Sequence, residues 1–98
     1  MSIDPRTIIE ATEAAFRVPK GSVVGKNRSP RISEARAVSI YISRKLTEYS
    51  TTELGNWFFN KDHSSIVKAT KKIDAVVSLK RRTDCYVAIE NLLEQLNV

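Results

Sequence analysis

The stretch STTELGNWFFNKDHSSIVKATKKIDAVVSL, residues 50–79, decides the fold. Ser50 followed by Glu53 three positions later is a capping box, which predicts the start of a short helix. A tight turn at residues 59–61 should separate this helix from a longer one that Asp62 caps and that runs to the end of the stretch. Two helices joined by roughly three residues have the geometry of a helix-turn-helix. The stretch therefore predicts that motif.

The longer predicted helix has two different faces. Its apolar residues recur with the helical period and can face a core: Ile66, Ala69, Ile73, Val76 and Val77. Its polar residues fall elsewhere around the axis and can face water or a ligand: Ser64, Ser65, Lys68, Lys71 and Lys72. The pattern thus predicts a helix that packs on one side and presents a basic surface on the other.

Three further helices are expected outside this stretch. Asp4 caps the first, which runs through Phe16, and a loop over 17–32 follows it. Ser33 caps the second, which runs to about Leu46, and Asp84 caps the last. The expected buried residues of the first helix are Ile8, Ile9, Thr12, Ala15 and Phe16, and those of the last include Val87, Ile89 and Leu92. The sequence predicts an all-α fold of about five helices in one domain, residues 1–98.

Charge is concentrated in the middle of the chain. The net charge of the 98 residues is +5. Residues 17–82 hold fifteen Lys and Arg against five acids, whereas both ends are mildly acidic. A basic middle predicts a polyanionic partner met by one surface, although a merely solvated basic surface is the alternative.

The first turn of the longer helix carries the candidate base-reading residues. In helix-turn-helix proteins this turn points at base edges in the major groove. Asp62 can accept from a cytosine amino group, and His63 or Ser64 can donate or accept at a purine. Taken alone, Asp62 is also explained as a helix cap, and His63 more simply as a surface imidazole. Arg28 and Arg31 lie in the predicted loop over residues 17–32 and can reach a neighbouring minor groove.

Catalytic and cofactor signatures are missing from the sequence. One His and one Cys cannot form a four-ligand zinc site, and no glycine-rich phosphate loop is present. No apolar run approaches the ~20 residues of a membrane span. We therefore expect no enzyme activity, cofactor, metal, small-molecule substrate or membrane span. The single cysteine fits a reducing cytoplasm.

Several of these motifs together resemble a known family. The matching stretches are Arg28-Ser-Pro-Arg-Ile-Ser-Glu-Ala-Arg36, Tyr41-Ile-Ser-Arg-Lys-Leu-Thr47, Ser50-Thr-Thr-Glu-Leu-Gly55 and Lys61-Asp-His-Ser-Ser-Ile-Val-Lys-Ala69. They resemble the C-terminal DNA-binding domain, domain IV, of the bacterial replication initiator DnaA. The basic-Asp-His-Ser-Ser element is the most specific of them. The resemblance covers nearly the whole chain.

The resemblance implies a Trp-repressor-like helical fold that binds a short asymmetric site, the DnaA box, as a monomer. It implies that Asp62, His63 and Ser64 read bases in the major groove and that Arg28 enters the minor groove. It also implies a set of residues that hold the DNA backbone: Arg36, Arg44, Ser50, Thr51, Thr52, Lys61 and Ser65. Lys68 and Lys72 join this set as flexible point charges. A bacterial cytoplasmic, nucleoid-associated location follows, with the initiator or other replication proteins as further partners.

Three departures from the family pattern leave other functions open. The turn reads Phe58-Phe59-Asn60 where the family has Phe-Gly, Ala37 stands where Gln is common, and Asn27 replaces a basic residue. The sequence also has no Walker motif, so it is either an excised domain or a stand-alone protein. The alternatives are a stand-alone transcriptional regulator with a diverged site and a helical protein-interaction module.

Overall fold

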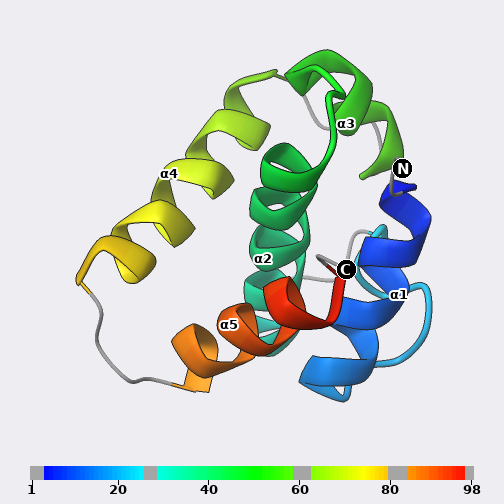
Figure 1. Cartoon of the computed structure of the whole chain (residues 1–98). Coiled ribbons are helices and arrows are strands. Elements are labelled where there is room, and N and C mark those ends of the chain that lie inside the picture. The colour runs from blue at the N-terminus through cyan, green and yellow to red at the C-terminus, as the bar shows by residue number, and fades with distance from the viewer. Residues whose placement is uncertain (1–3, 26–28, 59–62, 80–83, 97–98) are drawn as a thin grey trace.

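The computed structural model describes residues 4–25, 29–58, 63–79 and 84–96. Over these residues the regular secondary structure is helical, and the helices lie where the sequence predicts them except for the start of the second (Figure 1). In chain order they are α1 (Pro5–Phe16), α2 (Pro30–Leu46), α3 (Thr51–Trp57), α4 (His63–Leu79) and α5 (Asp84–Leu96). The all-α prediction is confirmed.

The start of α1 follows from its first two residues. Asp4 is extended, and its Oδ1 accepts a hydrogen bond of 2.8 Å from the backbone N–H of Arg6. Pro5 occupies the first helical position, where its missing N–H costs nothing. The helix ends at Phe16 because Arg17 adopts a left-handed conformation with φ of 56°.

The central helix α2 begins four residues earlier than expected. Ser29 is the N-cap residue and Pro30 opens the helix, so the prediction that Ser33 caps it is wrong. Proline at the first position explains the difference, since its fixed φ suits a helix start. As a consequence, Arg31 lies in the first turn of α2 and not in the loop before it.

The other helices pack around α2 (Figure 1). α1 and α4 make the most extensive contacts with it, α3 packs mainly on α4, and α5 lies against α1 and α2. Every residue of α2 from Ala35 to Ser43 is buried. This helix therefore forms the axis of the domain, and its burial exceeds the single apolar stripe that periodicity alone predicts.

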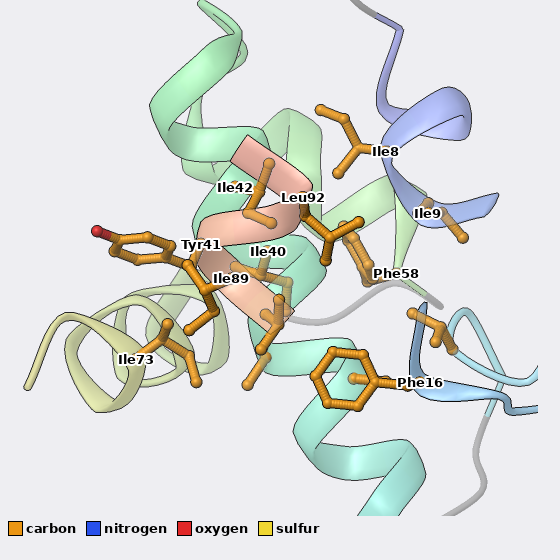
Figure 2. Packing of buried hydrophobic residues seen from close by; sticks show 14 of the residues in the cluster. Ile8, Ile9, Phe16, Ile40, Tyr41, Ile42, Phe58, Ile73, Ile89 and Leu92 are labelled. Atoms are coloured by element: carbon orange, nitrogen blue, oxygen red, sulfur yellow. The ribbon is translucent and has the colours of Figure 1, made fainter. Parts of the chain in front are cut away.

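Figure 2 shows the core as a cluster of side chains contributed by most of the helices. Ile8, Ile66, Ile73, Ile89 and Leu92 are each at most 1% exposed. Phe58, the residue that ends α3, is fully buried among them. Because α3 and α4 both bury residues in the same core, their relative placement depends on ordinary apolar packing.

Two residues predicted to be buried are exposed. Ala15 on α1 is exposed, and Val87 on α5 is 37% exposed. Both line an open hollow between α1 and α5, where no further helix covers them among the described residues.

Two hydroxyl groups inside α2 are also unusual. Ser39 and Ser43 are fully buried, and neither Oγ finds a hydrogen-bond partner within the part of the chain that the structure describes. They lie one helical turn apart on the same side of α2, so a small polar strip runs through an otherwise apolar region.

No helix in the described ranges combines the length and apolar character needed to cross a bilayer.

Candidate nucleic-acid interface

The start of α3 is held by the predicted capping box. The backbone N–H of Glu53 donates to Ser50 Oγ at 3.1 Å, and Glu53 Oε1 accepts from the backbone N–H of Ser50 at 3.2 Å. Ser50 and Thr52 are exposed, and Thr51 is half-buried. The capping box is therefore confirmed, and it leaves hydroxyl groups at the surface beside the first turn of α3.

The packing of α4 determines which of its residues face outward. Ile66 and Ile73 are buried against the core, with Val76 and Val77 partly buried near them. The opposite side of the helix is exposed, and we call five of its residues the α4 outer face: Ser64, Lys68, Lys71, Lys72 and Ala75. Asp74, Ser78 and Leu79 are exposed as well, nearer the end of the helix. Ser65 is half-buried at its border. The predicted division of this helix into a core face and a basic face is confirmed.

The α4 outer face has the dimensions of a groove-binding surface. Ser64 and Lys72 are eight residues apart, which corresponds to about 12 Å along a helix that rises ~1.5 Å per residue. A helix with its side chains is ~10–12 Å wide, and the major groove of B-form DNA is ~12 Å wide. The face therefore fits one groove, with its polar end at the helix N-terminus and its lysines farther along.

Two more cations lie at the end of α2. Arg44 and Lys45 are exposed in its last turn, where positive charge interacts favourably with the helix dipole. The ammonium of Lys45 lies 5.5 Å from the centroid of the Tyr41 ring. The sequence prediction gave Arg44 a role on the DNA backbone and gave none to Lys45, which is equally exposed.

Several predicted site residues fall outside what the structure describes. Arg28, Lys61 and Asp62 lie in the gaps between the described ranges. His63 is the first residue of α4, and only its backbone is described. Their proposed roles stay predictions. The described neighbours Ser64, Ser65 and Lys68 place the beginning of α4 at the surface.

Among the described residues, Arg36 is the predicted backbone contact that the structure places elsewhere. Its side chain is 7% exposed and points into the loop between α1 and α2. The guanidinium donates to the carbonyl oxygens of Val23 at 2.7 Å, Gly25 at 2.9 Å and Ser22 at 3.4 Å. Burial lowers the pKa of Arg36 from its ordinary value. With its donors turned toward these carbonyls, Arg36 is not placed to hold a phosphate, and we correct that expectation.

Sequence reasoning also missed Glu13. This carboxylate is 3% exposed and binds the same loop. It lies one turn after Ile9 and one turn before Phe16, both of which are buried. That spacing was a sign that the side chain faces inward.

Metal chemistry has no support in the described part of the chain, where no three His, Cys, Asp or Glu side chains come together in a way that would hold an ion.

A capped short helix, a longer helix packed against it and a basic outer face define a helix-turn-helix domain of the DNA-binding class. The family model for the bacterial DnaA protein helix-turn-helix matches residues 5–73. The chain therefore belongs to this family.

Complete initiator proteins are similar to this chain over most of its length. The chromosomal replication initiator protein DnaA of Tropheryma whipplei (strain Twist) is 35% identical over 95 residues, which are 95% of this chain and 20% of that protein. The DnaA of Clavibacter sepedonicus is 32% identical, covering 96% of this chain and 19% of that protein. The DnaA of Limosilactobacillus reuteri (strain DSM 20016) is 33% identical, covering 92% of this chain and 20% of that protein. The chain thus spans about a fifth of the length of these curated relatives.

Proposed function

We propose that this chain binds double-stranded DNA at DnaA-box-like sites, in the initiation of replication or its regulation, and that α4 enters the major groove. The observation that carries the proposal is the α4 outer face. The side chains of its first turn are polar, and Lys68, Lys71 and Lys72 follow on the exposed side of the helix. Membership of the DnaA helix-turn-helix family supports the assignment of this helix to recognition.

In this proposal the residues of the first turn of α4 read the bases. Asp62, His63 and Ser64 have side chains short enough to approach base edges at a helix start, where acceptors and donors match cytosine and purine groups. Arg28 reads the adjacent minor groove, as the arm of a homeodomain does. The site is short and asymmetric, and one copy of the chain occupies it.

The remaining residues hold the sugar-phosphate backbone. The hydroxyls at the start of α3 and the cations around them supply these contacts without base preference. The proposed set is Arg44, Lys45, Ser50, Thr51, Thr52, Lys61, Ser65, Lys68, Lys71 and Lys72. Each cation in it that neutralises a phosphate releases counterions, so the affinity should fall steeply as salt is raised.

A gel-shift series on DnaA-box and scrambled duplexes of equal length tests the proposal at near-physiological salt. We expect the box duplex to bind more tightly by a factor of about a thousand or more. Tight binding to another sequence on a DNA array would favour the regulator with a diverged site. Equal affinity for all duplexes would contradict sequence recognition.

A further inference from the structure

The open hollow between α1 and α5 exposes apolar side chains to water. Ala15 of α1 lines one side of it, and Val87, which is 37% exposed, belongs to the lining that α5 contributes. The hollow has a volume of about 340 Å³, so it can receive a side chain from another molecule. Covering its apolar residues would be favourable because apolar surface would leave water.

The charges beside this hollow are predominantly negative. Glu90 and Glu94 are exposed on α5, about one and two turns after Val87. They are the charged side chains that the structure describes on this helix. From the second turn of α1 onward, the exposed acid Glu10 is offset by the exposed cation Arg17. A partner for the hollow should therefore combine an apolar side chain with positive charge.

The end of α4 has these properties. Leu79 is 64% exposed, and it and Val87 are the two exposed large hydrophobic residues in the described part of the chain. Leu79 follows Ala75 by four residues and Lys72 by seven, so the three side chains lie along one side of the helix. Asp74 is the exposed acid nearby. An apolar tip on a basic helix is thus complementary to the hollow.

The position of Leu79 leaves it available when DNA is bound. It lies fifteen residues after Ser64, which corresponds to about 22 Å along α4. In the proposed function the first turn of α4 reads the bases, and the major groove is only ~12 Å wide. The leucine also does not line the hollow of its own chain. Its partner is therefore expected on a second molecule.

We propose that two copies of this chain bound to neighbouring DNA sites contact each other head to tail, with Leu79 of one copy in the α1–α5 hollow of the next. Glu90 and Glu94 of the second copy face the lysines of the first. The inference rests on the proposed function, and each site still holds one copy. It extends that function from single sites to arrays of sites.

The contact has a direction, which makes its consequence specific. A head-to-tail contact joins two different surfaces, so it requires the same rotation from each copy to the next. Two asymmetric sites in the same orientation can meet this requirement at a suitable spacing. Two sites in opposite orientation bring like surfaces together and cannot. Cooperative binding is therefore expected on direct repeats and not on inverted repeats.

Gel shifts on duplexes with one box, two boxes in the same orientation and two in opposite orientation test the proposal. The spacing is varied in single base pairs over one turn of ~10.5 base pairs. We expect the natural chain to bind the second box of a direct repeat about tenfold more tightly than the first at a preferred spacing, because the neighbouring copy is held close by. Inverted repeats should show no gain.

Variants assign the contact to its two surfaces. Leu79→Ser and Val87→Ser should each abolish the gain and leave single-box affinity unchanged, whereas Ser78→Ala, an exposed neighbour of Leu79, should keep it. An equal mixture of the two serine variants should recover a gain of about threefold, since one of their four arrangements on two boxes joins an intact leucine to an intact hollow. A fold defect in either variant would not be rescued in this way.

Glu94→Lys keeps the test decisive if Val87→Ser folds poorly, as judged by thermal melts. Its added positive charge predicts tighter binding to a single box, whereas the proposed contact predicts a smaller gain on the direct repeat. Single-box binding without cooperativity at any spacing, or cooperativity that survives Leu79→Ser, would overturn the inference and leave the proposed function intact. Failure of the natural chain to distinguish a single box from a scrambled duplex would instead reject the proposed function.

Discussion

Two basic parts of this chain use their charges in opposite ways. On the α4 outer face, Lys68, Lys71 and Lys72 are exposed, and the apolar residues of the same helix pack away from them. At the loop between α1 and α2, Arg36 is turned inward and binds backbone carbonyls. The number of basic residues in a segment therefore does not define a nucleic-acid surface. The side of the helix on which each one lies decides whether it meets a ligand or holds the fold.

The largest effect on stability should come from Arg36. Arg36→Ala leaves the carbonyls of Val23 and Gly25 without their donor in a buried place, and we expect a loss of about 3 kcal/mol in the free energy of unfolding. Urea denaturation measures it. Arg44→Ala, an exposed arginine on the same helix, should change stability by no more than about 0.5 kcal/mol. Equal losses of stability in the two variants would contradict the claim that the buried Arg36 holds the fold while the exposed Arg44 does not.

The next effect concerns sequence preference. Asp62→Ala and His63→Ala should each reduce the discrimination between box and scrambled duplexes by about 1–3 kcal/mol, because base contacts are lost while backbone contacts stay. Competition gel shifts against duplexes with single base changes measure this quantity. If a variant loses affinity equally for every duplex, the replaced residue contacts the DNA backbone and not the bases.

A smaller, sequence-independent effect is expected from Lys68. Lys68→Ala should weaken binding to all duplexes alike and reduce the slope of log affinity against log salt by about 1. Its melting temperature should stay the same, since the side chain is exposed. Arg6→Ala is the control, because Arg6 is an exposed cation on α1, a helix that packs on α2 and α5. If the salt slope falls as much for Arg6→Ala as for Lys68→Ala, the DNA does not bind preferentially at α4.

The smallest effect should come from the buried serine hydroxyls. Unlike Arg36, Ser43 is buried without a hydrogen-bond partner among the described residues. Ser43→Ala removes a polar group whose desolvation is uncompensated, so stability should be unchanged or rise by up to about 1 kcal/mol. Thermal unfolding followed by circular dichroism checks this. A clear loss of stability would mean that the hydroxyl has a partner in the native protein.

Most of the fold could be predicted from local signals. Asp4-Pro5 and the Ser50–Glu53 box mark helix starts because their side chains satisfy backbone N–H groups within three residues. The two faces of α4 follow from the period of its apolar residues. The start of α2 was misplaced because both Ser29-Pro30 and Ser33 offer a plausible cap, and proline at the first position decided between them.

The hydrogen bonds that Glu13 and Arg36 make with the loop between α1 and α2 could not be predicted, because they are not local. Arg36 binds carbonyls 11 to 14 residues before it, and Glu13 binds N–H groups 8 and 10 residues after it. The period of α1 and α2 indicates that both side chains face inward. It does not indicate which backbone groups will meet them, since that depends on the path of the intervening loop.

An amide chemical-shift titration of the chain with a DnaA-box duplex tests directly whether α4 meets the DNA. We expect the largest changes at Ser64, Ser65 and Lys68 on α4 and in the first turn of α3. Amides on the exposed side of α5, such as those of Glu90 and Glu94, should hardly move. Changes centred on α1 and α5, with α4 unaffected, would contradict the claim that α4 enters the DNA.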